Sequence, residues 1–200
     1  MKNNLTLDWF NKLKKHKIPE ISNIAKLVPC PSFVIPKWTN IDDAVIFIVI
    51  NQMLSIKASE TICSNLFSEF NDSKNILKFC CDTYNIKGAL MGLSQRKRIT
   101  LKNWYDFKMS SNINFSKKRN QLLFLDELKK QKGFGQWSID MLSIFYFGMS
   151  NIWPLNDMNI LKVSKIIFGT SDKDIIKSKI VNHETIIALC FWEIIDRNIF

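Results

Sequence analysis

LKKQKGFGQWSIDMLSIFYFGMSNIWPLNDMNI, residues 128–160, is the stretch that decides the fold of this chain. It begins in a run with helical spacing, turns at Gly133-Phe134-Gly135, and continues from Gln136 in a second helical run. Glycine at both ends of the turn permits positive φ and lets the backbone approach a partner closely. The stretch therefore predicts two helices joined by a tight hairpin.

The start of the second helix is a candidate anion site. The unpaired amides of a helix N-terminus, together with the helix dipole, favour a phosphate group. Three lysines at 129, 130 and 132 would surround that group with positive charge. A Gly-x-Gly turn by itself, however, is more often only a turn than a phosphate cradle. Further along, WPLND at 153–157 precedes a new helical run, so Asp157 also qualifies as a helix N-cap.

Most of the remaining chain has helical periodicity as well. An amphipathic run over 7–13 predicts an opening helix, and Asp42 and Asp43 precede the apolar run AVIFIVI of a buried one. Three prolines predict an extended connector over 28–40. Further helices are predicted over 58–70, 73–81, 95–107, 119–130, 136–147, 157–168 and 184–195. No pair of strands is predicted, so the expected fold class is all-α.

Length and charge limit the class of partner. Two hundred residues form one compact unit, or two small lobes that share a core. The formal charge of +10 favours a polyanionic partner, although charge alone fits a merely basic soluble protein equally well. No apolar run is long enough to cross a bilayer, and the N-terminal residues lack the apolar core of a signal peptide. We therefore expect a cytoplasmic protein without a membrane partner.

Cysteine and histidine do not predict a metal centre. The five cysteines have no regular ligand spacing, and the adjacent Cys80 and Cys81 suit neither a zinc knuckle nor an iron–sulfur loop. His16 and His183 stand far apart in the sequence. The cysteines are interpreted as reduced thiols.

Four segments resemble, in chain order, the motifs of one enzyme superfamily. INQMLSIKA at 50–58 is similar to a Gly-Gln-x-x-Ser segment, and GLSQRKR at 92–98 to a Gly-Leu-x-x-Arg/Lys helix start. GFGQWS at 133–138 is similar to the hairpin, and PLND at 154–157 to a Pro-x-x-Asp that places an essential aspartate. The chain thus resembles the helix-hairpin-helix/Gly-Pro-Asp DNA glycosylases, most of all the 3-methyladenine DNA glycosylase II branch. The resemblance covers roughly residues 41–192.

The resemblance implies a two-lobed helical DNA glycosylase fold with a helix-hairpin-helix motif and an interlobe cleft. Residues 41–149 would form the lobe with the wedge and the hairpin. Residues 1–40 plus 150–200 would form a second helical lobe that carries the catalytic aspartate. The implied enzyme flips a damaged base, expected to be an alkylated purine, out of double-stranded DNA and hydrolyses its N-glycosidic bond in base-excision repair. We expect it to act as a monomer, associated with the nucleoid if the source is bacterial.

The roles of the family fall on particular residues of this chain. Catalysis falls on Asp157, and Trp137 stands where bifunctional members carry a Schiff-base lysine, which implies a monofunctional hydrolase. The base pocket falls on Trp137, Met141 and Trp192, and the wedge on Gln52 and Met53. The implied DNA-binding residues are Ser55, Arg96, Arg98, Lys132, Gly133, Phe134, Gly135, Gln136 and Ser138. No cofactor is implied beyond a structural Na⁺ or K⁺ ion on the backbone carbonyls of Lys129, Gln131 and Phe134.

Several of these roles have an alternative. Asp157 can be an N-cap and nothing more, Met53 can be a core methionine, and the pocket residues can be ordinary core side chains. The basic residues 96–98 can be a solvated face. Asn51, Ile139 and Asp140 depart from the family pattern, so a glycosylase for a deaminated or oxidised base is an alternative. From a different class, the chain can be a helix-hairpin-helix DNA-binding module without catalysis.

Overall fold

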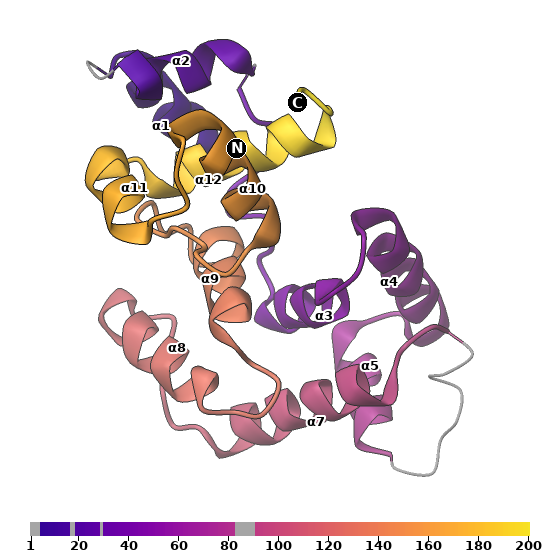
Figure 1. Ribbon diagram of the computed structural model, residues 1–200. Helices are drawn as coiled ribbons and strands as arrows, with labels where there is room; N and C mark the ends of the chain where they lie inside the picture. The colour runs from indigo at the N-terminus through magenta and orange to yellow at the C-terminus, as the bar shows by residue number, and fades with distance from the viewer. Residues whose placement is uncertain (1–4, 17–18, 29, 83–90) are drawn as a thin grey trace. The chain divides into compact units, whose positions relative to one another are not determined.

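The computed structural model describes residues 5–16, 19–28, 30–82 and 91–200, and within these ranges every regular element is helical (Figure 1). The prediction of an all-α fold is therefore confirmed. The helices are α1 (Leu5–Lys14), α2 (Pro19–Leu27), α3 (Ile41–Asn51), α4 (Ile56–Phe70), α5 (Ser73–Cys81), α7 (Gln95–Ser110), α8 (Gln121–Lys129), α9 (Gln136–Phe145), α10 (Met158–Phe168), α11 (Lys173–Ile180) and α12 (Glu184–Asp196), with a 3₁₀ turn, η1, at Lys118–Asn120.

The predicted helix boundaries agree to within a few residues, and α5 agrees at both ends. The helix predicted over 119–130 divides into η1 and α8, and α9 ends at Phe145 rather than at 147. Two short helices, α2 and α11, were not predicted; they bury only three and two residues, respectively. The connector over 28–40 is non-helical between α2 and α3, although Pro29 lies outside the described residues.

The chain divides into two compact units. Residues 1–37 together with 143–200 form the first unit, and residues 38–142 form the second unit. The hairpin and the segment 50–58 belong to the second unit, whereas Asp157 and Trp192 belong to the first unit. The boundary falls inside α9, between Leu142 and Ser143.

The second unit is built around α3. Eight of its eleven residues are buried, and the helix is apolar on nearly every side, so it must be surrounded by other helices. Helices α4, α5 and α7 pack against it. Its one buried charge, Asp42, accepts hydrogen bonds from Trp104 Nε1 (2.9 Å) and Lys108 Nζ (2.6 Å) on α7. The Asn40 side chain caps the helix by accepting from the amide of Asp42.

The first unit is built in the same way around α12. Every residue from Glu184 to Phe191 is buried, and α1, α2, α10 and α11 pack against the helix. Trp153 and Phe168 both contact the ring of Phe191, with centroid distances of 5.6 and 5.9 Å. Each unit therefore has its own core, formed by one buried helix and a ring of amphipathic ones.

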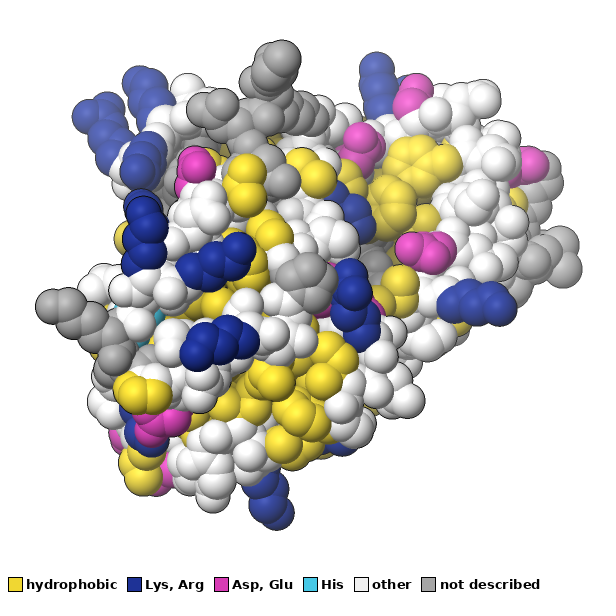
Figure 2. Space-filling view, turned by 90° about the horizontal axis from the view of Figure 1, so that it is seen from above, with side chains coloured by type: hydrophobic (Ala, Val, Ile, Leu, Met, Phe, Trp, Pro, Cys, Tyr) yellow, Lys and Arg dark blue, Asp and Glu magenta, His cyan; other side chains and the backbone are white. Residues whose placement is uncertain are grey.

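Positive charge is concentrated at the surface. Among the described residues the buried charged side chains are all acidic, namely Asp42, Asp140, Glu184 and Glu193, and none is Lys or Arg. The surface is consequently more basic than the net charge of +10 indicates. Figure 2 shows lysine and arginine side chains spread over one face, with hydrophobic side chains exposed between them. In the described part of the chain, no helix is long and apolar enough to cross a membrane.

Candidate nucleic-acid interface and active site

The hairpin between α8 and α9 is fixed to α7. Gly133 has φ +102°, and a Cβ atom there would overlap the side chain of Thr100 on α7. Asn103, also on α7, donates through Nδ2 to the carbonyl of Lys132 at 2.8 Å. Phe134 is buried, and its amide donates to the carbonyl of Gln131 at 3.1 Å. Glycine is thus required at 133 by both backbone conformation and space.

Gly135 differs from the expectation that both hairpin glycines take positive φ. Its φ is not positive, because it stands directly before α9, and its carbonyl accepts from the amides of Ser138 (3.0 Å) and Ile139 (3.2 Å) as an N-cap carbonyl does. A Cβ atom at Gly135 would meet nothing within 4 Å. The backbone at 135 is therefore open to the close approach of another molecule, at the end of α9 where the amides favour an anion.

Most hairpin side chains are engaged inside the second unit. Lys129 Nζ donates to Gln136 Oε1 (2.6 Å), and Gln136 Nε2 donates to Asp140 Oδ1 (2.7 Å). Burial raises the pKa of Asp140 to about 6, an effect that the Gln136 hydrogen bond and the charge of Lys129 oppose. Ser138 is buried and bonded as well, whereas Lys132 is exposed. The hairpin thus presents backbone and Lys132 to a partner, rather than Phe134, Gln136 or Ser138 side chains.

The turn between α3 and α4, residues 52–55, is called here the wedge turn. Met53 at its tip has φ +59° and is 99% exposed, and Ile56 just beyond it is 55% exposed. Ser55 caps α4 by accepting from the amide of Ala58 at 3.3 Å. The alternative that Met53 is a core methionine is therefore wrong.

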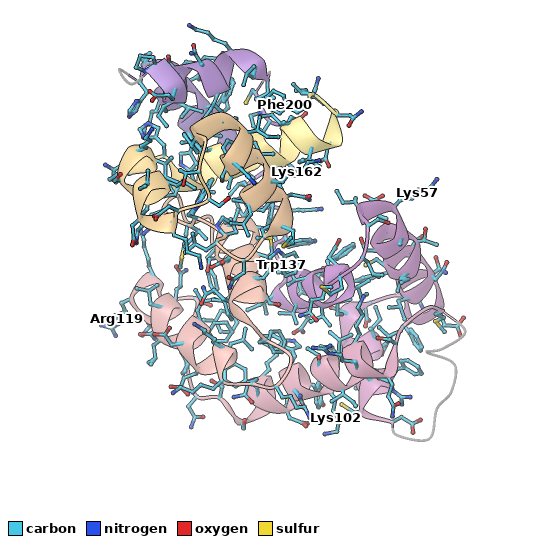
Figure 3. The ribbon with its side chains drawn as sticks, in the orientation of Figure 1. Lys57, Lys102, Arg119, Trp137, Lys162 and Phe200 are labelled. Atoms are coloured by element: carbon cyan, nitrogen blue, oxygen red, sulfur yellow. The ribbon has the colours of Figure 1, made fainter. Side chains whose placement is uncertain are left out.

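The basic residues 96–98 at the start of α7 have three different surroundings. Lys97 is turned inward: its Nζ donates to the carbonyl of Ile50 at 2.6 Å, and burial lowers its pKa. Arg98 lies over the ring of Phe79 at 5.0 Å. Only Arg96 is exposed. Of the two arginines predicted to bind DNA, only Arg96 is therefore fully presented at the surface. Lys57 and Arg119 are exposed as well, and Figure 3 shows their side chains.

Asp157 is the N-cap of α10. Its Oδ1 accepts from the amides of Asn159 (2.9 Å) and Ile160 (3.1 Å), and the residue is half-buried. The loop before it, residues 149–157, is held by α12: the Thr185 hydroxyl donates to the carbonyl of Met149 (2.9 Å) and accepts from the amide of Ile152 (3.0 Å). The carboxylate therefore has a fixed position and remains partly accessible to solvent.

The predicted pocket residues lie in different units. Trp137 and Met141 are on α9 in the second unit, with Met141 buried and Trp137 half-buried (Figure 3). Trp192 is on α12 in the first unit, half-buried, and stacks on Phe145 with ring centroids 5.8 Å apart. Phe33 contacts both rings. Neither Phe33, which lies in a connector without periodicity, nor Phe145, which lies within the predicted helix 136–147, was among the predicted pocket residues.

Metal-ligating side chains do not gather within the described ranges. No group of three or more His, Cys, Asp or Glu residues there could hold a metal ion. All five cysteines are free thiols, and burial raises the pKa of Cys80 to about 12. For the expected monovalent cation, the Gln131 carbonyl already accepts from Phe134, and Lys129 ends α8, where carbonyls lack partners within the helix.

No protein-family model matches the chain. Among curated proteins, it is 25% identical over 175 residues to the alkylbase DNA glycosidase-like protein mag2 of Schizosaccharomyces pombe, a match that covers 82% of this chain and 81% of mag2.

Three solved structures have a similar fold. They are the DNA-3-methyladenine glycosidase of Bacillus halodurans (TM-score 0.66, 18% identity, 89% of each chain), the Schizosaccharomyces pombe 3-methyladenine DNA glycosylase Mag1 in complex with abasic DNA (0.68, 18%, 92% of this chain and 93% of that one) and the Archaeoglobus fulgidus 3-methyladenine DNA glycosylase (0.69, 16%, 98% and 70%). The chain has the fold of the 3-methyladenine DNA glycosylases, and its resemblance to the helix-hairpin-helix DNA glycosylase superfamily is confirmed.

Proposed function

We propose that this chain is a monofunctional DNA glycosylase of the 3-methyladenine glycosylase II type. It would extrude an alkylated purine from duplex DNA and hydrolyse the N-glycosidic bond as the first step of base-excision repair. The observation that carries the proposal is Asp157, a half-buried carboxylate fixed at the start of α10, in a chain with the fold of 3-methyladenine DNA glycosylases.

The carboxylate would act by electrostatics. Cleavage of an N-glycosidic bond builds positive charge on the sugar as the base leaves, and a fixed negative charge lowers the energy of that state. Two backbone amides and the anchored loop hold Asp157 in place, so little reorganisation is needed during the reaction. Asp157 can also orient or deprotonate the attacking water. An alkylated purine already carries positive charge and leaves readily, which suits a site with a single carboxylate.

DNA would be bound by the second unit. The open backbone at Gly135 and the first amides of α9 can take a phosphate, with Lys132 exposed beside them. Met53 is free to enter the base stack. The carbonyls of Lys129, Gln131 and Phe134 would hold a Na⁺ or K⁺ ion, whose positive charge would help attract that phosphate. We expect the aromatic rings of Trp137 and Trp192 to stack on the damaged base.

Because position 137 is a tryptophan and not a lysine, we expect the enzyme to hydrolyse the glycosidic bond without cutting the DNA strand. Bifunctional glycosylases cut the strand through a Schiff base on a lysine, and the indole of Trp137 cannot form one. The product would be an intact strand with an abasic site. We propose a cytoplasmic location, with nucleoid association if the source is bacterial, where the enzyme would meet its DNA substrate.

The proposal is tested by base release. Duplexes that each carry one defined lesion (3-methyladenine, 7-methylguanine, hypoxanthine, uracil or 8-oxoguanine) are incubated with the protein, and free base is quantified. We expect release of alkylated purines, no adduct trapped by borohydride, and strand breaks only after alkali. A trapped adduct would contradict the monofunctional mechanism. Tight DNA binding without release from any lesion would favour a non-catalytic DNA-binding module, and release confined to uracil, hypoxanthine or 8-oxoguanine would favour a different substrate class.

A further inference from the structure

The wedge turn has almost no apolar anchorage. Met53, Leu54 and Ile56 are all exposed, so side-chain burial cannot fix the position of the turn. Hydrogen bonds hold it instead. Lys97 Nζ donates to the carbonyl of Ile50, and Asn51 accepts from Ser59 Oγ at 2.6 Å. Both of these links hold the end of α3 just before the turn, and within the turn the amide of Leu54 donates to the carbonyl of Asn51 at 3.2 Å.

Gln52 supplies the remaining link, and it reaches the hairpin. Its Nε2 donates to the carbonyl of Gly133 (3.0 Å) and to Ser138 Oγ (2.9 Å), across 81 and 86 residues of sequence. Both acceptors are themselves fixed, since Gly133 packs on Thr100 and Ser138 is buried in α9. In the described residues, these are the only side-chain hydrogen bonds that join the wedge turn to the hairpin.

We propose that Gln52 is a positioning residue that tethers the wedge to the phosphate-binding hairpin, and that it does not itself enter the DNA. This inference rests on the proposed function and gives Gln52 a different role from that of a second wedge residue. With the tether in place, a phosphate bound at the hairpin would set the depth to which Met53 penetrates the duplex.

The physical reason is the cost of base extrusion. Unstacking a nucleotide costs a few kcal/mol. Binding energy gained at the hairpin can offset that cost only if the hairpin and the wedge turn are rigidly connected. Met53 stands on a turn with positive φ, a conformation that a methionine adopts only when its surroundings hold it there. Without the Gln52 bonds, insertion would push the turn back toward solvent, and the hairpin would bind DNA that remains stacked.

The test uses Gln52→Met, which keeps side-chain length and removes the donor without adding charge. The matched control is Gln121→Met at the start of α8. The readout is a duplex with a tetrahydrofuran abasic analogue and 2-aminopurine opposite it, whose fluorescence rises on unstacking and does not depend on catalysis. Affinity for an unmodified duplex of the same sequence is measured in parallel, with thermal melts of each variant.

We expect Gln52→Met to retain the affinity of the parent for the unmodified duplex and to lose about tenfold in affinity for the abasic duplex, as two lost hydrogen bonds would produce. The 2-aminopurine response should fall as it does for Met53→Ala. The double variant Gln52→Met/Met53→Ala should be no worse than Met53→Ala alone, because the tether acts only through the wedge. The control should behave as the parent.

Three results would overturn the tether. They are a full 2-aminopurine response in Gln52→Met, an equal loss of affinity for both duplexes, and losses that add fully in the double variant. The last two would make Gln52 a support of the hairpin or of the fold. Base release is scored separately: a parent protein that unstacks 2-aminopurine but releases no base would refute the glycosylase proposal and leave the tether standing.

Discussion

The wedge turn of the second unit and the loop before Asp157 in the first unit each present one residue for function, and they are built in opposite ways. The loop is anchored by side chains: Trp153 is buried against Phe191, and Thr185 bonds the backbone at two places. The wedge turn exposes Met53 and Leu54 and relies on hydrogen bonds at the end of α3 and through Gln52.

The difference follows from what each residue has to do. A carboxylate that stabilises a developing cation acts best when it is fixed before the reaction, so its loop is packed into a core. A side chain that fills a gap in a base stack must stand clear of the protein, so its turn cannot be buried. The loop before Asp157 therefore holds its residue rigidly, whereas the wedge turn extends its residue away from the protein.

The largest expected effect comes from Asp157→Asn. Asparagine retains the shape and can accept the two capping bonds, so the loop and the fold should be unaffected. Loss of the charge should lower single-turnover base release by about 10²–10³-fold or more, while abasic-DNA affinity and the 2-aminopurine response stay as in the parent. Base release by Asp157→Asn at the parental rate would mean that Asp157 serves only as the N-cap of α10.

The next effect separates the two hairpin glycines. Gly133→Ala should destabilise the protein by about 2–4 kcal/mol, because alanine is strained at φ +102° and collides with Thr100. Gly135→Ala should leave the melting temperature unchanged, since its Cβ meets open space, yet weaken binding to all duplexes where a phosphate must approach. Equal losses of stability in the two variants would contradict this division.

Thr185→Val tests the anchor of the Asp157 loop. Valine has the shape of threonine but leaves the amide of Ile152 and the carbonyl of Met149 without the hydroxyl, at a cost of about 1–3 kcal/mol. Base release should fall with stability, and duplex affinity should not. The matched control is Thr61→Val, whose exposed hydroxyl bonds only within α4. If both variants melt at the same temperature, the loop is held by packing alone.

Asp140→Asn should have the smallest effect on base release, and its effect on stability depends on pH. Burial raises the pKa of Asp140 to about 6, so the folded state binds a proton more readily than the unfolded state does. The contribution of this group to stability therefore falls as pH rises from about 4 to about 6. Asparagine can still accept from Gln136, and the variant should exceed the parent by about 1–3 kcal/mol at pH 7.5.

The pH dependence itself is the check on Asp140. Thermal melts at pH 7.5 and pH 4 should show the advantage of Asp140→Asn at the higher pH and its loss at the lower. The control is Asp106→Asn, an exposed carboxylate paired with Lys102 on α7. An advantage of equal size at both pH values would mean that packing, and not ionisation, distinguishes the variant.

Local chemistry was sufficient to predict much of this protein. The spacing of apolar residues predicted the long helices. The sequence WPLND predicted the cap on α10, because a helix start depends on residues a few positions apart. The motifs 50–58, 92–98, 133–138 and 154–157 resemble those of the DNA glycosylases whose fold the chain has. The short helix α11 was not predicted, since half of its residues are charged and only two isoleucines are buried.

The tertiary structure decided what each of these residues faces. The sequence could not distinguish Gly133 from Gly135, or Lys97 from Arg96, because the difference lies in Thr100 behind one glycine and in the Ile50 carbonyl beside one lysine. The sequence allowed Met53 to be either a wedge or a core residue, and it did not indicate that Gln52 bonds to Gly133 and Ser138. Periodicity and capping are local, whereas burial, a steric overlap and a hydrogen bond across eighty-one residues of chain exist only after the helices have packed.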